Sequence, residues 1–407
     1  MKDRCVLCVV LACALPTVLA AEVQVNMRTS GSQANPATAV EAAGGSIVVW
    51  SSYYSAPGRS NDILARRLDP LGGFAGDEFQ VNVLSEGNQT EPAVATSPRG
   101  AFAVAWQGPG LDQEDIFLRL LDPNGNPTTD ELLVTSRTAG RQLYPSVAMS
   151  DGAIMLAWES REVVNDVNTT SVRAQVFEPN GAAVCEEITA DTAAYDGRYP
   201  EVAADGSGRF AVVWMQDRSN HPIMARLFDP NGTPATDAFR VNVEGITSLT
   251  RPSVAMNSRG YFVIAWDGDP NRAGDDDIHA RLYEPNGLPA GEPFIVNTMR
   301  TGAQQWPQVA VNDANEFVVV WEHETGDPNT ATDIFARRFD GQGQPAGDQV
   351  QLNTYTQGKQ RYPDVAVAAD GSFIAAWESE GQDSASYGVF AHIEAPLIAP
   401  APNEATP

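Results

Sequence analysis

The chain has 407 residues, of which 43% are hydrophobic and 19% are charged, and its formal net charge is −26 at pH 7. An acidic surface of this kind repels nucleic acid and anionic membranes and favours solubility, so neither is expected as a partner. No apolar run approaches the roughly 18 residues that a transmembrane helix needs.

The N-terminal segment has the pattern of a secretory signal peptide. Lys2 and Arg4 precede an apolar run over residues 5–14, and Ala20 offers a small residue at the cleavage position. This run is too short to span a bilayer. We therefore expect residues 1–20 to be a signal peptide, and the mature protein to be secreted or periplasmic and monomeric.

The cysteines leave one alternative for this segment. A lipoprotein signal would make Cys13 the acylated residue and would give a lipid-anchored protein. Removal of the signal peptide leaves Cys185 as the single cysteine. The mature chain must then be stabilised by a large buried core, because it cannot form an internal disulfide.

Seven tryptophans divide the rest of the chain into units of similar length. They recur at intervals of 52–56 residues, each at the end of a short apolar run. They are Trp50, Trp106, Trp158, Trp214, Trp266, Trp321 and Trp377. In five units a phenylalanine lies four residues before the tryptophan, which places both side chains on one face of a strand. A fixed period of this length indicates a repeat architecture.

Each unit is predicted to contain four strands, A to D. In the fifth unit these are expected at 251–257, 261–266, 277–285 and 294–298, with a Pro-Asn-Gly turn between the last two. Proline and glycine at these positions suit a turn that needs a left-handed residue. No segment shows sustained helical periodicity. Seven such units predict an all-β fold, a seven-bladed β-propeller with four antiparallel strands per blade.

The two ends of the repeat region predict how the ring closes. Residues 22–26 match the D strands of other units, whereas 387–394 is a C strand that no D strand follows. The N-terminal strand is therefore expected to complete the last blade. The predicted propeller covers 21–395, and the Pro/Ala-rich residues 396–407 are expected to be a disordered tail.

The repeat resembles those of exported bacterial β-propeller proteins with tryptophan-containing blades of about 55 residues. The resemblance rests on the motifs Pro-x-Val-Ala, Gly-x-Phe-x-Val-x-Trp, Ile-x-Ala-Arg-x-Phe-Asp and Phe-x-Val-Asn, and covers the whole mature chain. The chain is more distantly similar to the integrin-type FG-GAP propellers, but it lacks their Asp-x-Asp-x-Asp-Gly calcium hairpin. The resemblance implies a fold and an exported location, and little about activity.

The candidate binding site is expected at one mouth of the central channel. In each blade the B–C and D–A connections emerge on the same face, and the B–C segments vary most, so this face is predicted to carry the function. The residue before the proline of each strand A should rim the channel there. The predicted ligand-binding residues at or beside this rim are Tyr144, Tyr199, Trp306, Tyr362, Arg198, Arg251 and Arg361. Aromatic rings suit sugar rings and arginines suit carboxylates or sulfates; alternatively, the aromatic residues fill the channel as core.

The acidic segment that follows Trp266 begins like a calcium-binding loop. Asp267 and Asp269 match the first positions of an EF-hand, but glycine is missing at the sixth position and glutamate at the twelfth. The sequence favours a solvated acidic loop, with weak calcium binding at Asp267, Asp269 and Asp275 as the alternative. No cofactor is predicted.

Three further sets of residues recur in most units and are interpreted as structural. The glutamines and asparagines are expected to satisfy the backbone of the D–A turns through side-chain hydrogen bonds, and the arginines to pack between strands with strand-end acids as candidate partners. Glutamine lies three residues before the strand A proline at positions 33, 89, 142, 304 and 360. Asparagine closes strand D at 26, 82, 242, 297 and 353. Arginine recurs in strand C at 66, 119, 226, 281 and 337.

No catalytic motif is present, and no catalytic residue is predicted. The sequence favours an exported, non-catalytic propeller that recognises an extracellular polysaccharide at the channel mouth. A surface protein-interaction scaffold that uses the long B–C and D–A connections is the first alternative. A polysaccharide lyase or hydrolase is the second.

Overall fold

The structure, a computed structural model, describes residues 21–396 except for eleven short gaps. The gaps are 42–43, 54–59, 111–112, 137–139, 165–166, 192–195, 218–220, 244–250, 270–275, 328–330 and 384–385. The predicted signal peptide and all but the first residue of the predicted tail lie outside the described residues. None of the described segments forms a helix that could cross a membrane.

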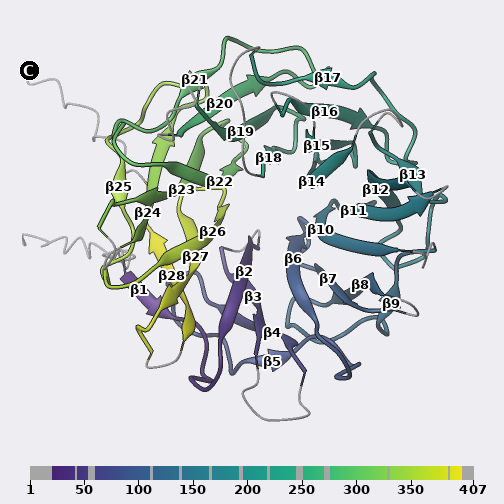
Figure 1. The fold of residues 1–407 in the computed structure, drawn as a ribbon, viewed down its shortest axis with the longest axis horizontal. Coiled ribbons are helices and arrows are strands. Elements are labelled where there is room, and N and C mark those ends of the chain that lie inside the picture. Colours follow the sequence, from purple (N-terminus) through teal and green to yellow (C-terminus); the bar gives the residue numbers. More distant parts are fainter. Residues whose placement is uncertain are drawn as a thin grey trace, which may run out of the picture.

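Seven four-stranded antiparallel sheets surround a central axis as the blades of a propeller (Figure 1). The innermost strands A, from blade 1 to blade 7, are β2 (Gln33–Val40), β6 (Thr90–Thr96), β10 (Arg141–Met149), β14 (Gly197–Ala204), β18 (Ser253–Met256), β22 (Gln304–Val311) and β26 (Gln360–Val367). The tryptophan strands B are β3 (Ser46–Ser52), β7 (Phe102–Pro109), β11 (Ile154–Val164), β15 (Phe210–Gln216), β19 (Phe262–Gly268), β23 (Phe317–Glu324) and β27 (Phe373–Glu380). This confirms the predicted fold.

The outer half of each blade follows the same order. The strands C are β4 (Asp62–Leu68), β8 (Glu114–Leu121), β12 (Val167–Phe177), β16 (Ile223–Phe228), β20 (Asp277–Tyr283), β24 (Thr332–Phe339) and β28 (Tyr387–Glu394). The outermost strands D are β5 (Phe79–Gln80), β9 (Leu132–Leu133), β13 (Ile188–Thr189), β17 (Phe239–Arg240), β21 (Phe294–Ile295), β25 (Val350–Gln351) and, in blade 7, β1 (Ala21–Gln24).

The N-terminal strand closes the ring as predicted. β1 pairs antiparallel with β28, with Glu22 opposite His392 and Gln24 opposite Phe390. Two further hydrogen bonds extend this contact, because Val25 N donates to Val389 O and Val389 N donates to the side chain of Asn26, both at 2.8 Å. β1 therefore covers the edge that β28 would otherwise present to solvent.

The core lies between the blades. The seven tryptophans have no exposed surface, and each packs in an apolar cluster built from two neighbouring blades. Trp50 of blade 1, for example, packs with Ile374 and Val389 of blade 7. Cys185, the single cysteine among the described residues, is free, so burial of these large side chains is a main source of stability for the blades.

The recurrent glutamines have a role that the sequence did not predict. We expected them to satisfy the D–A turn backbone, but in all five blades the side-chain oxygen accepts the tryptophan indole N–H, at 2.9–3.2 Å. The amide nitrogens of three of them, Gln89, Gln304 and Gln360, do also donate to turn carbonyls. The glutamine thus permits the indole to be fully buried without leaving its donor unpaired.

The recurrent asparagines and arginines connect strands. The amide nitrogens of Asn26, Asn82, Asn297 and Asn353 also donate to carbonyls of the D–A turns, as predicted. Each of the five asparagines accepts the N–H of a strand C residue at 2.8–3.0 Å, which ends strand D earlier than the sequence suggested. Each arginine donates to a backbone carbonyl beside the D strand of the preceding blade. These arginines therefore fasten neighbouring blades through carbonyl groups rather than through the strand-end acids we had considered as partners.

Candidate functional site at the channel mouth

The predicted rim residues surround a cavity of about 240 Å³ at the central axis. Figure 1 shows the strands A, which carry or adjoin them, innermost around this axis. All seven are half-buried: Asn35, Glu91, Tyr144, Tyr199, Arg251, Trp306 and Tyr362. The four aromatic residues are therefore partly exposed at the cavity, and Tyr199 also packs against the apolar cluster between blades 4 and 5.

Six of these seven residues have a left-handed backbone, with φ between 50° and 55°: Asn35, Glu91, Tyr144, Tyr199, Trp306 and Tyr362. In each of the six blades the rim residue and its proline form a bulge that shifts the register of strands A and B. A following proline disfavours the right-handed helical region, and a left-handed non-glycine residue costs on the order of 1–2 kcal/mol. The ring therefore stores backbone strain at its mouth.

The side chain that follows the tryptophan offsets this strain in four blades. It accepts the N–H of the rim residue in the next blade along the ring. The pairs are Gln107 with Tyr144 (3.0 Å), Glu159 with Tyr199 (3.2 Å), Glu322 with Tyr362 (2.6 Å) and Glu378 with Asn35 (3.1 Å). Sequence reasoning missed these residues, although their position directly after each tryptophan, on the opposite face of strand B, was a usable signal.

The rim aromatics form two pairs joined by one arginine. The rings of Tyr144 and Tyr199 have centroids 5.0 Å apart, and those of Trp306 and Tyr362 are 5.1 Å apart in an edge-to-face arrangement. The guanidinium of Arg251 lies 4.3 Å, 5.0 Å and 5.3 Å from the ring centroids of Tyr144, Tyr199 and Trp306. Arg251 thus reaches across the mouth and holds both pairs together by cation–π contacts.

Each predicted site arginine is paired with an acid. Arg251 contacts Glu91 at 3.3 Å, and Arg198 contacts Asp217 at 2.8 Å. Arg361 forms a short ion pair with the buried carboxylate of Glu378. These arginines are largely neutralised within the protein, so the rim does not present the free guanidinium groups that a carboxylate or sulfate receptor would need.

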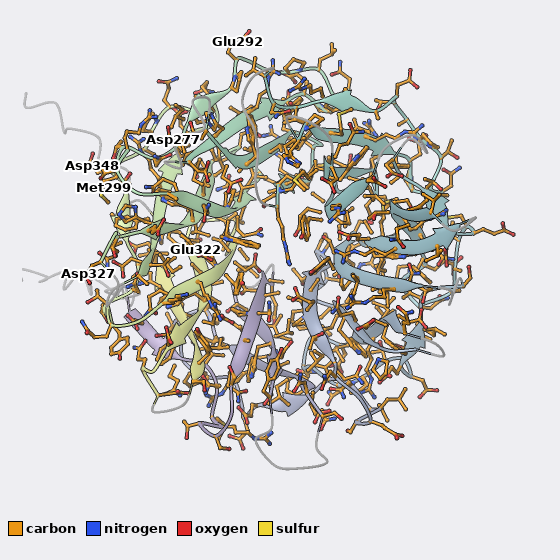
Figure 2. The ribbon with its side chains drawn as sticks, in the orientation of Figure 1. Asp277, Glu292, Met299, Glu322, Asp327 and Asp348 are labelled. Carbon is orange, nitrogen blue, oxygen red and sulfur yellow. The ribbon has the colours of Figure 1, made fainter. Side chains whose placement is uncertain are left out.

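A second hollow opens beside the rim, between blades 6 and 7, and is called the blade 6–7 groove here. Its volume is about 470 Å³. Trp306, Tyr362 and Arg361 line it together with Glu322, Glu324, Asp327 and Lys359. Figure 2 shows Glu322 nearer the axis and Asp327 towards the outer edge of the ring. The groove therefore continues outward from Trp306 and Tyr362 along the face on which the B–C and D–A connections emerge.

Four acids near the axis, Glu322, Glu378, Glu201 and Asp364, have pKa values that burial raises. Burial raises the pKa of Glu322 to about 8, and the like charge of Glu378 adds to this effect. Deeper in the channel, burial raises the pKa of both Glu201 and Asp364 to about 7. Glu201 accepts the Ser146 hydroxyl at 2.8 Å, and Asp364 accepts the Thr38 N–H at 2.6 Å. With these pKa values, Glu322, Glu201 and Asp364 carry protons over part of the neutral pH range.

The two described residues of the weak metal hypothesis are not on a solvated loop. Asp267 lies within β19, directly after Trp266, and both it and Asp269 are buried. Asp275 lies outside the described residues. The described part of the chain has no group of three or more potential metal-ligating side chains.

Comparisons with known proteins identify the fold. No protein-family model matches the chain, and no curated protein sequence matches it. A solved protein of unknown function from Dyadobacter fermentans is 12% identical, with a TM-score of 0.53, 76% of this chain covered and 95% of that one. The Penicillium chrysogenum α-L-arabinanase complexed with arabinobiose is 14% identical (TM-score 0.54, 79% and 98% covered).

A third similar structure is a polysaccharide lyase of family PL25, an ulvan lyase bound to a glucuronate–sulfated rhamnose unit. It is 10% identical, with a TM-score of 0.56, and 92% of this chain and 96% of that chain are covered. At such identities the likeness establishes a shared propeller fold and no more.

Proposed function

We propose that the protein is an exported, non-catalytic propeller that binds an extracellular polysaccharide at the channel mouth and the adjoining groove. The observation that carries the proposal is the half-buried Trp306–Tyr362 pair, which lines both the channel cavity and the 470 Å³ groove. Aromatic faces at the edge of a hollow are the surfaces on which sugar rings stack.

The charges beside this pair favour a glycan that is not strongly anionic. Arg251 and Arg361 are already paired with Glu91 and Glu378, and Glu322, Glu324 and Asp327 add acidic groups to the groove. Carboxylates accept hydrogen bonds from sugar hydroxyls. This refines the prediction from sequence, in which the arginines were expected to receive carboxylate or sulfate groups.

Two of the similar structures also agree with a polysaccharide ligand. One is an arabinanase with arabinobiose, and the other is a polysaccharide lyase bound to a glucuronate–sulfated rhamnose unit. The shared fold shows only that proteins of this architecture can bind such ligands, and it does not transfer their function to this chain.

The test is a thermal-shift screen of the mature protein against neutral, amino-bearing and acidic polysaccharides, with and without calcium. A ligand that binds only the folded state raises the melting temperature. We expect a shift with at least one neutral or amino-bearing glycan and none that depends on calcium. Depolymerisation of a bound glycan would contradict the non-catalytic proposal, and the absence of any shift would contradict glycan binding.

A further inference from the structure

The glutamate directly after the strand B tryptophan occurs in several blades, so its surroundings can be compared from one blade to another. Three blades carry it, as Glu159, Glu322 and Glu378, and in each the carboxylate accepts a rim N–H of the next blade. All three side chains are buried, with at most 7% exposed. A buried carboxylate needs a positive partner to stay charged.

Two of the three glutamates have an arginine partner within the protein. In blade 3 Arg161, two residues along the same strand, pairs with Glu159 at 2.5 Å. In blade 7 Arg361, opposite in the register of β26 and β27, pairs with Glu378. The two blades thus supply the same charge from two different positions.

Blade 6 has neither arginine. The position opposite Glu322 is Gln305, whose amide nitrogen donates instead to Asp276 at 3.0 Å. The position two residues along the strand is Glu324, a second acid. Within the described residues Glu322 has no ion pair, and its one hydrogen bond is to Tyr362 N.

The place where a partner would lie is open rather than packed. Glu322 and Glu324 both line the blade 6–7 groove, next to Trp306 and Tyr362. The positively charged residues of that groove do not pair with Glu322. Arg361 is paired with Glu378, and its guanidinium lies 4.3 Å from the Tyr387 ring centroid. Lys359 is exposed. Their charges lower the pKa of Glu322, but burial outweighs them.

We infer that the blade 6–7 groove binds a positively charged amino group of the ligand, so that the polysaccharide of the proposed function is one that carries primary amines. The ligand ammonium would replace the arginine that blades 3 and 7 supply, donating to Glu322 and lying against the rings of Trp306 and Tyr362. Glu324 and Asp327 add negative potential on the same side. The inference rests on the proposed function and names its substrate class.

Three oligosaccharides with the same β-1,4 glucan backbone isolate the amino group. They are fully deacetylated chitosan hexamer, its N-acetylated counterpart and cellohexaose, which carry an ammonium, an acetamide and a hydroxyl at the same carbon. We expect isothermal titration at pH 6 to show the deacetylated hexamer binding about tenfold or more tightly than the other two, because a charge-assisted hydrogen bond adds to the shared stacking. Its binding should also release close to one proton, since ion pairing ionises Glu322.

Two variants assign this preference to its residue. Glu322→Gln should bring the three affinities within about twofold of one another and abolish the proton release. The fold accepts glutamine at this position, because Gln107 makes the equivalent bond in blade 2. The matched control, Glu159→Gln in blade 3, should keep the wild-type preference.

The outcomes separate this inference from the proposed function. Equal affinity for the three hexamers, or preference for the amine that survives Glu322→Gln, would overturn the inference while leaving glycan binding in place. Failure of the deacetylated hexamer to bind at up to about 1 mM would also overturn it, whether or not another polysaccharide raises the melting temperature.

Discussion

Replacing Glu322 by glutamine should flatten the dependence of stability on pH above neutrality. Burial raises the pKa of this carboxyl from 4.5 to about 8 in the folded protein. The folded state therefore holds a proton that the unfolded state has lost, and stability falls as pH rises between these two values. One proton corresponds to about 1.4 kcal/mol per pH unit, so the whole window is worth on the order of 4–5 kcal/mol.

The most informative interval is pH 7 to 8. Glu201 and Asp364, with pKa values of about 7, contribute mainly below it. Burial also raises the pKa of Glu378, so the contribution of Glu322 is read from the difference between the wild-type and Glu322→Gln slopes. Urea unfolding followed by tryptophan fluorescence from pH 5 to 9 gives the slope. Wild type and Glu159→Gln should lose stability over this interval, whereas the free energy of unfolding of Glu322→Gln should fall by about 1 kcal/mol less. Identical slopes for all three proteins would refute the assignment of an uncompensated buried acid to blade 6.

Three further changes test other parts of the structure. Gln360→Ala should destabilise the protein by about 1–3 kcal/mol, because it leaves the buried Trp377 indole N–H without its acceptor; an unchanged urea midpoint would contradict this. Deletion of residues 21–28 removes β1 and should lower the melting temperature and promote association through the bare β28 edge; a truncated chain that melts like the mature protein and stays monomeric would refute the closure argument. Arg251→Met should weaken the contact between the two aromatic pairs and change the near-ultraviolet circular dichroism, with less than about 2 kcal/mol of destabilisation; an unchanged spectrum would count against the bridging role.

The fold was predictable because each blade repeats the same physical solution. The tryptophan period, the alternation within strands and the unmatched strands at the two ends together predicted seven blades and the pairing of β1 with β28. The sequence pattern did not predict the hydrogen-bond partner of each polar side chain. Gln304 was assigned to a turn, where its amide nitrogen does donate to Gly302 O. Its side-chain oxygen accepts the Trp321 indole N–H across 17 residues, because the strand register brings the two side chains together.

The candidate site was only partly predictable for the same reason. The position before the strand A proline led to the rim, and the structure places Tyr199, Trp306 and Tyr362 there as half-buried residues. The acids that neutralise the arginines come from other strands, and Glu91 of blade 2 reaches Arg251 of blade 5 across the channel mouth, so no local spacing reveals them. Glu322 becomes notable only when three blades are compared in register, which requires the pairing of Gln305 with Glu322 to be known.

The most direct test of glycan binding at the channel mouth is the affinity of Trp306→Ala for the polysaccharide found in the thermal-shift screen. Tyr261→Ala is the control, because Tyr261 lies in an A–B turn at the opposite face and is likewise half-buried. Loss of one stacking residue should weaken binding at least tenfold for Trp306→Ala, with a change in stability of about 2 kcal/mol or less, and should leave Tyr261→Ala with wild-type affinity. Wild-type affinity of a folded Trp306→Ala protein would contradict the proposed site.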